Sequence, residues 1–347
     1  MSTADASRVR VVGGGPAGAA AALAALAEGA RVTIEEKSVF PRHKVCGEFL
    51  SPEIAPILDE LGLGGLLAAS HAARITRAAL HIGGREKRFR LPETAYGLSR
   101  SSLDRLLFEA AQRRGAAPNA PRARLGAPGA AAPEPDFGRC SAVVIARGRR
   151  AGSGAGARSG TRIFGFKAHH VGAAARASDD AVELYFFEGG YCGVSPIENG
   201  AINVCGLAPE ALLRARGFRP DALFPPALVS RLRGLERSFD WLLTGPLDLH
   251  GGLHARSDAY LAGDALSFVD PFTGSGILAA LLTGRLAGRA AARRLSHDRY
   301  HAECRRVLRR QRDVAALLRD MLRARLSASL VRWIPGRLLY QLTRPAC

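Results

Sequence analysis

The sequence of 347 residues predicts an α/β fold, in which a parallel-sheet domain contains an inserted antiparallel β-sheet domain and is followed by C-terminal helices. Three observations predict it. Residues 8–36 have the pattern strand, glycine turn, helix, strand; residues 180–207 hold short alternating segments separated by Gly-Gly and Asn-Gly; and residues after 276 are rich in Ala, Leu and Arg at helical spacing. These patterns are typical of a βαβ unit, antiparallel hairpins and helices, respectively.

The opening unit has consistent local signals. Strands are expected at Arg8–Val12 and Arg31–Glu35, with a helix at Ala17–Ala27 between them. Pro16 suits the first helical turn, where its missing N–H has no partner to lose, and Gly29 suits the left-handed residue that ends a helix. We therefore expect the first βαβ unit of a doubly wound sheet.

A glycine motif lies between the first strand and its helix. It places Gly13, Gly15 and Gly18 in a G-x-G-x-x-G pattern, which allows a tight turn, close approach of a pyrophosphate, and close packing of the helix. Glu36 follows Gly13 by 23 residues, at the end of the second strand, where a carboxylate can accept from both ribose hydroxyls and repels a 2′-phosphate. The sequence thus predicts a Rossmann-type domain that binds FAD or NAD rather than NADP.

Further helices are expected along the chain. One covers Ser102–Arg114, with an apolar face and either Ser101 or Ser102 as its cap. Another follows Gly276, and a last one covers 299–325.

Two central segments differ in character. Residues 180–207 predict a β-rich substrate domain. Residues 115–138 are rich in Ala, Pro and Gly and low in β-branched and aromatic residues, so we expect a poorly ordered excursion with no regular sheet.

Composition excludes several classes of protein. The formal net charge of +18 comes almost wholly from arginines spread along the chain, so we expect no nucleic-acid partner. The six cysteines form no C-x-x-C pair and no stretch of about 18 residues is apolar and uncharged, so thiols and a cytoplasmic protein are expected. Arginines concentrate in 285–344, which is typical of a solvated helix; a peripheral contact with anionic lipid is the alternative.

A second motif lies near the C-terminus. The strand Tyr260–Leu261 leads to Gly263 and Asp264, and a glycine turn then precedes the helix after Gly276. The Asp264 carboxylate can accept from a polyol hydroxyl, and the helix N-terminus over Gly274–Ile277 can stabilise an anionic reduced flavin. Strand, carboxylate, turn and helix thus recur far from the first motif.

Together with three further segments, these motifs resemble one family. The segments are Phe40–Pro52 (FPRHKVCGEFLSP), Leu98-Ser99-Arg100 and Gly165–His169. The sequence is similar, from residue 8 to about residue 295, to the geranylgeranyl reductase-like branch of the FAD-dependent oxidoreductases, which share the p-hydroxybenzoate hydroxylase fold. The resemblance implies a Rossmann-type FAD-binding domain with an inserted antiparallel β-sheet substrate domain and C-terminal helices.

The resemblance also implies roles for residues. It assigns the ADP half of FAD to the motif glycines and Glu36, and places Arg42, Arg100 and Asp264 by the phosphates, the ribityl chain or their surroundings. Cys46 would lie beside the flavin, as a candidate catalytic thiol or as a small buried residue under it, whereas His169 and His170 are interpreted as structural. No metal site is predicted. The candidate cofactor-binding residues are Gly13, Gly15, Pro16, Ala17, Gly18, Glu36, Lys37, Arg42, Cys46, Gly47, Arg100, Gly263, Asp264, Pro271, Gly274, Gly276 and Ile277.

The function implied is FAD-dependent reduction of a hydrophobic substrate, with NAD(P)H as a transient electron donor. Reduction of a C=C bond is the favoured reaction. An aromatic monooxygenase is the first alternative, weakened by Arg147 where relatives carry Asp or His. A halogenase is disfavoured because the W-x-W-x-x-P pattern is missing. A second alternative, suggested by Arg147 and residues 115–138, is a flavoprotein that binds FAD or a partner without catalysis.

The expected division of the chain follows from these assignments. Residues 1–50, 96–165 and 255–295 form the FAD-binding domain, 51–95 and 166–254 the substrate domain, and 296–347 a C-terminal helical segment.

Overall fold

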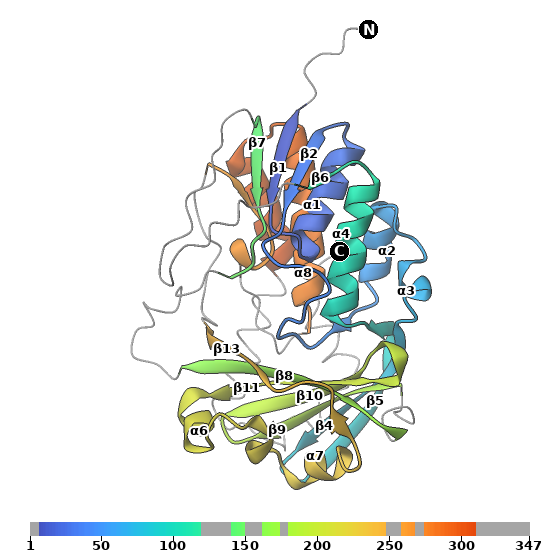
Figure 1. Cartoon of the computed structure of the whole chain (residues 1–347), viewed down its shortest axis with the longest axis vertical. Coiled ribbons are helices and arrows are strands. Elements are labelled where there is room, and N and C mark those ends of the chain that lie inside the picture. The colour runs from blue at the N-terminus through green and yellow to red at the C-terminus, as the bar shows by residue number, and fades with distance from the viewer. Residues whose placement is uncertain are drawn as a thin grey trace, which may run out of the picture.

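Two β-sheets, one above the other in Figure 1, form the framework of the molecule. The structure is a computed structural model and describes residues 7–118, 140–149, 162–173, 180–247, 258–267 and 274–309. Helices flank the upper, parallel sheet, while the lower sheet is larger and mostly antiparallel. The predicted α/β class is confirmed.

The parallel sheet has the strand order β14-β7-β1-β2-β6 over the described residues. β1 (Arg8–Val12) lies at its centre between β2 (Arg31–Glu35) and β7 (Ala142–Ile145), and β14 (Tyr260–Leu261) and β6 (Ala117–Pro118) lie at its edges. Every pairing is parallel. The segments that follow β1, β2 and β14 therefore meet at one edge of the sheet, as expected for an open α/β sheet.

Strand β6 corrects the expectation of no regular sheet over 115–138. Residues 117–118 pair in parallel with Thr33 and Ile34 of β2. The pairing uses backbone groups, so it does not need residues that favour strands, and Pro118 is tolerated because β6 is an edge strand. Residues 119–138 lie outside the described part.

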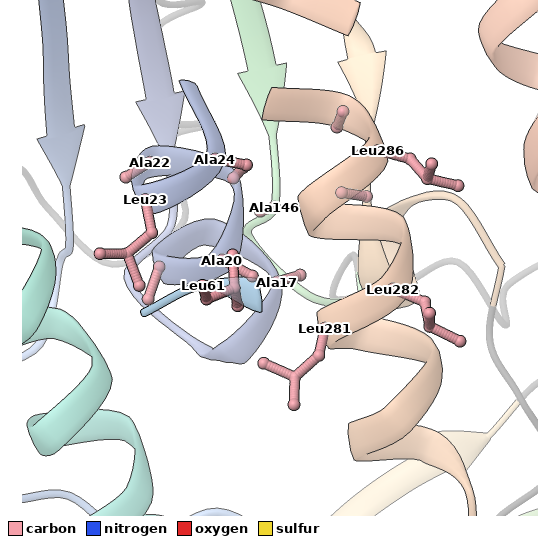
Figure 2. Packing of buried hydrophobic residues seen from close by; sticks show 14 of the residues in the cluster. Ala17, Ala20, Ala22, Leu23, Ala24, Leu61, Ala146, Leu281, Leu282 and Leu286 are labelled. Atoms are coloured by element: carbon pink, nitrogen blue, oxygen red, sulfur yellow. The ribbon is translucent and has the colours of Figure 1, made fainter. Parts of the chain in front are cut away.

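Helices α1 (Pro16–Ala27) and α8 (Gly276–Ala292) pack directly on each other (Figure 2). A β-carbon added at Gly284 would lie 2.1 Å from the carbonyl oxygen of Ala17, and the same spacing recurs one turn later at Gly288. Backbones approach this closely only where no side chain intervenes. The contact fixes the start of α1 against the second motif.

Helix α4 (Arg100–Arg113) begins two residues earlier than expected. Its N-cap is Ser99, whose hydroxyl accepts from the Ser102 N–H at 3.1 Å. The expected cap, Ser101 or Ser102, was wrong because only Ser99 has the extended backbone of a cap, while the later serines already lie in the first turn.

The second sheet has the order β12-β8-β11-β10-β9-β4-β5-β3, with β13 also paired to β8. All its pairings are antiparallel except that between β4 and β9. The hairpins predicted over 180–207 are confirmed as β9, β10 and β11. The strands are β3 (Phe49–Leu50), β4 (Ala73–Ile82), β5 (Arg85–Gly97), β8 (Ile163–Val171), β9 (Ala181–Phe187), β10 (Gly190–Pro196), β11 (Ile202–Pro209), β12 (Glu236–Arg237) and β13 (Leu242–Leu247).

The two faces of this sheet have different neighbours. Helices α6 (Glu210–Ala215) and α7 (Pro226–Arg231) lie on its outer side, where Phe166, Val194 and Val204 are buried. The inner face is turned toward the parallel-sheet part (Figure 1). Any group bound between the two sheets would therefore meet this inner face.

Two short helices join the first core. Ile54 and Leu58 of α2 (Ile54–Glu60) and Leu67 of α3 (Leu66–Ala69) are buried with α1 and α8. From the range 51–95, expected in the substrate domain, only the strands β4 and β5 join the second sheet. The packing of α2 and α3 thus differs from that expected boundary.

The basic C-terminal region is described only in part. Residues 297–309 are helical, which agrees with the start of the helix expected over 299–325. Arg285 and Arg289 of α8, and Arg293 directly after it, form ion pairs with Glu28 and Glu60. No helix within the described ranges has the length and apolar character needed to cross a membrane.

Candidate functional site

The first glycine turn is built on backbone contacts. Gly13 has a φ of +109°, and its N–H donates to the Glu35 carbonyl at 2.8 Å. A β-carbon at Gly18 would lie 1.7 Å from the Gly13 carbonyl oxygen, and one at Gly13 would lie 2.4 Å from the carbonyl oxygen of Ala146. The backbone around exposed Arg147 therefore passes directly over the turn. Both positions require glycine, as the motif predicts.

Gly15 opens onto a space bordered by positive charge. It is the N-cap of α1, with Pro16 at the first helical position and Ala17 buried behind it. Among the described residues, a β-carbon at Gly15 would have two neighbours within 4 Å, Nη2 of Arg100 at 3.7 Å and Nη2 of Arg42 at 3.9 Å. A helix N-terminus and two guanidinium groups suit a pyrophosphate.

A buried carboxylate aligns the two arginines. Asp104 Oδ2 accepts from Arg42 Nη1 at 2.8 Å, and its oxygens accept from Arg100 Nε at 2.6 Å and Nη2 at 2.8 Å. Burial works against the Arg100 charge, but the Asp104 charge and hydrogen bonds raise its pKa above the usual value. The sequence analysis missed Asp104, although its spacing of four residues from Arg100 on a helix was a usable signal.

Glu36 closes the other side of the turn. Its Oε2 accepts from Gly14 N at 2.9 Å and from Arg42 Nη2 at 3.1 Å, while Oε1 accepts from Ser38 N at 2.9 Å. Burial opposes ionisation, but the Arg42 charge and the two backbone donors lower the Glu36 pKa below its usual range. A carboxylate has about four lone-pair sites, so further acceptor capacity is left for ribose hydroxyls. The neighbouring Lys37 is exposed.

The second motif packs against the first. Gly263 has a φ of +60°, and a β-carbon there would lie 2.9 Å from Cβ of Ala17 in α1. Burial raises the pKa of Asp264, and the nearby charges of Arg100 and Arg149 oppose this effect. The structure therefore brings Asp264 close to Arg100, one of the two arginines that border the space at Gly15.

The start of α8 follows the second motif in the chain. Gly274 has a φ of +61°, and its added β-carbon would lie 3.5 Å from Cδ1 of Phe49. Gly276 begins the helix with no atom within 4 Å of its added β-carbon, and Ile277 is buried. Pro271 lies outside the described residues.

Cys46 lies between these elements and the second sheet, in a turn of residues 44–48 that we call the Cys46 turn. Its side chain is half-buried, its Sγ accepts from Glu48 N at 3.5 Å, and it makes a side-chain hydrogen bond with Arg100. Asn203 Nδ2 donates to the Cys46 carbonyl at 3.0 Å. Gly47 is exposed, with no atom within 4 Å of its added β-carbon. The thiol therefore contacts one of the guanidinium groups at the anion space.

Two histidines lie on opposite faces of β8. His169 Nε2 is 2.7 Å from Glu48 Oε2, on the inner face. The ring of His170 lies 6.0 Å from that of Trp241, on the outer face. Burial, and then the charge of Arg237, lower the pKa of His170 to about 4.

Comparisons with known proteins agree with this geometry. A family described as FAD binding domain matches residues 6–126. Menaquinone reductase of Mycobacterium tuberculosis is 33% identical over 321 residues, which cover 83% of this chain and 77% of that protein. The chain belongs to the menaquinone reductase family. As a member of it, the chain is an FAD-dependent oxidoreductase, so the alternative of a non-catalytic flavoprotein no longer applies.

Solved structures support the family's fold. The flavin-dependent halogenase CmlS has a TM-score of 0.75 and 21% identity, covering 99% of this chain and 68% of that one. A geranylgeranyl bacteriochlorophyll reductase-like protein of Thermoplasma acidophilum has a TM-score of 0.71 and 20% identity, covering 97% and 92%. At these identities the likeness confirms the Rossmann-type FAD-binding fold and carries no statement about the reaction.

Proposed function

We propose that this enzyme reduces a C=C bond of a hydrophobic, isoprenoid-bearing quinone of the menaquinone class. Two findings support the proposal: the name of its relatives in mycobacteria, and a strip of apolar and small residues beside the Cys46 turn. The strip is the observation that carries the substrate class.

The strip crosses the inner face of the second sheet. Cross-strand pairing joins Leu80 to Leu184, Leu184 to Gly193, Gly193 to Cys205, and Cys205 to Lys167. Paired residues project on the same face of a sheet. The first four are half-buried, which leaves an apolar surface that a prenyl chain could cover.

The strip ends beneath the Cys46 turn. Cys205 makes a hydrogen bond with the Cys46 backbone, and Lys167 Nζ donates to the Lys44 carbonyl at 3.1 Å. Burial raises the pKa of the Cys205 thiol, so this thiol stays protonated and behaves as an apolar group. An apolar chain on the strip would therefore point toward Cys46.

The residues around Gly15 fit FAD, which when bound supplies the hydride for the reduction. We assign the pyrophosphate to the space between α1, Arg42 and Arg100, and the adenosine ribose to Glu36. Asp264, together with the start of α8 at Gly276, would hold the ribityl chain and the flavin ring. The remaining candidate residues of the two glycine motifs shape these turns.

Cys46 is the candidate proton donor in this proposal. A C=C reduction needs a proton at the carbon that does not receive the hydride. Cys46 is a titratable side chain that the turn places between the space at Gly15 and the strip. NAD(P)H remains the proposed electron donor, bound transiently.

The test is reduction of menaquinone in detergent by the FAD-loaded protein under anaerobic conditions, with NADPH or dithionite as reductant. Mass spectrometry should show a product that has gained two hydrogens in the side chain. A Gly193→Leu variant places a side chain on the strip and should lower turnover by about tenfold or more while FAD binding is unchanged.

The matched control adds volume elsewhere. Val229→Phe enlarges an exposed side chain of α7, on the outer side of the sheet, and should leave turnover unchanged. A reduced flavin that transfers nothing to menaquinone would overturn the proposed substrate. Oxygen uptake coupled to hydroxylation of an aromatic compound would favour the monooxygenase alternative.

A further inference from the structure

We propose that Glu48 is a positioning residue: its buried carboxylate, held by Lys167 and His169 of β8, fixes the position of the Cys46 thiol. The inference rests on the proposed function only for the catalytic use of that thiol. The positioning of the thiol follows from contacts between residues of this chain and does not depend on the substrate.

The donors to Glu48 come from strand β8 and from the start of helix α4. Oε1 accepts from Lys167 Nζ in a short ion pair and from Arg100 N at 2.5 Å, and Oε2 lies 2.7 Å from His169 Nε2. Glu48 and Lys167 are fully buried. Lys167 also donates to the Lys44 carbonyl, at the start of the Cys46 turn. One carboxylate thus joins β8, the turn and the first residue of α4.

Stability alone does not account for this arrangement. Burying an ion costs several kcal/mol, and a buried ion pair is often no more stabilising than apolar residues of similar volume. Burial opposes the charge of Glu48, but the His169 hydrogen bond and the Lys167 charge lower its pKa below the usual range. The charged group is therefore held in one geometry, which is what a positioning role requires.

The backbone of Glu48 gives independent support. Its φ is +55°, in the left-handed region that disfavours a side chain and where glycine is preferred. This conformation directs the Glu48 N–H to Cys46 Sγ at 3.5 Å. The same residue therefore contacts β8 through its carboxylate and the thiol through its backbone.

Asn203 supplies the remaining link from the second sheet. It pairs with His169 across β11 and β8, and its Nδ2 donates to the Cys46 carbonyl at 3.0 Å. The strands that carry the apolar strip therefore also hold the turn. A substitution of Glu48 or Asn203 should therefore change the position and the reactivity of the Cys46 thiol.

The experiment measures how fast iodoacetamide alkylates Cys46 in the FAD-loaded protein, with each cysteine followed by peptide mass spectrometry. In Glu48→Gln the turn loses its charged anchor, so Cys46 should react about fivefold faster or more. Cys140, which is remote from the turn, should react at the wild-type rate and serves as the internal control.

Glu198→Gln is the matched control variant. Glu198, between β10 and β11, is also a buried carboxylate, and at the start of α4 it accepts from Ser99 N at 2.8 Å and Ser102 Oγ at 2.6 Å. Within the described residues its hydrogen bonds do not reach the Cys46 turn. It should lower stability and leave the Cys46 rate within about twofold of the wild type.

Asn203→Ala tests the same link without disturbing the buried charges, so it decides the question even if Glu48→Gln does not fold. Unchanged Cys46 alkylation in the folded variants would overturn the inference. In the menaquinone assay, Glu48→Gln should lower kcat by about tenfold with little change in KM. A wild-type protein that does not turn over menaquinone would contradict the proposed function instead, because the alkylation result does not depend on the substrate.

Discussion

At the scale of single residues, the site depends on Gly15 having no side chain. Arg42 and Arg100 both come within 4 Å of the place that a β-carbon would take, and Asp104 holds them there. We expect Gly15→Val to fold, because no backbone atom is in the way, but to weaken FAD binding by about tenfold or more, or roughly 1.4 kcal/mol. Titration of the apoprotein with FAD, followed by flavin fluorescence, measures this change.

The control for this variant is Gly84→Asn. Gly84 has a left-handed backbone that Asn tolerates, and its added β-carbon has no neighbour within 4 Å. It should bind FAD as the wild type does. Equal FAD affinity in both variants would contradict the placement of the pyrophosphate.

His170 makes a second prediction, on the dependence of stability on pH. Its pKa is about 4 in the folded protein, because burial and then Arg237 disfavour the charged form, against about 6.5 when unfolded. Protons therefore favour the unfolded state, so this stabilisation is complete above pH 6.5 and is lost as the pH falls toward 4. Between pH 7.5 and pH 5 the loss should be about 2 kcal/mol in the free energy of unfolding.

His170→Phe should remove that part of the loss, as measured by urea unfolding at the two pH values. Phe keeps an aromatic ring beside Trp241 and cannot take up a proton. His71→Asn, at an exposed histidine, is the control and should keep the wild-type dependence. An unchanged slope in His170→Phe would show that this histidine does not titrate as stated.

The sequence could identify residues whose role depends on local spacing. The motif glycines and Glu36 are of this kind, because a tight turn and the following strand place them together. Lys167 and Glu48 act through partners far away in the chain, which spacing does not reveal. Spacing reveals the pairing of Asp104 with Arg100 but not its contact with Arg42. A lysine between Phe166 and Ala168 on a strand was the one available hint that Lys167 has a buried partner.

At the scale of elements, the contact of α1 with α8 holds the two motifs together. Gly284→Ala would place a β-carbon 2.1 Å from the Ala17 carbonyl oxygen, so the helices must separate. We expect a loss of about 2–3 kcal/mol in the free energy of unfolding, measured by urea denaturation of the apoprotein. Gly276→Ala is on the same helix, and its added β-carbon has no neighbour within 4 Å among the described residues, so it should leave the free energy of unfolding unchanged. Equal stability of the two variants would contradict the close approach.

Elements were predictable where pattern and turn signals agreed. The hairpins over 180–207 follow from alternation and from their glycine turns. The start of α4 was misplaced because several serines in a row offer similar caps, and only the extended backbone of Ser99 distinguishes them. Strand β6 was missed because its pairing depends on a neighbouring strand rather than on its own residues.

At the scale of the whole molecule, the two sheets meet at the Cys46 turn. The parallel sheet supplies the anion space, and the second sheet supplies the apolar strip and the anchors Lys167, His169 and Asn203. Sequence patterns predicted both sheets but not which of them α2 and α3 join, because amphipathic helices pack equally well on either until the fold is complete.

We propose that this family member binds FAD at the Gly15 site and uses it as an oxidoreductase. The most direct test is the visible absorbance spectrum of the purified, FAD-loaded protein before and after anaerobic addition of NADPH, with the released chromophore identified by mass. We predict flavin bands from FAD that bleach on reduction and return when menaquinone is added. Failure to bind FAD even when it is supplied in excess would contradict the account.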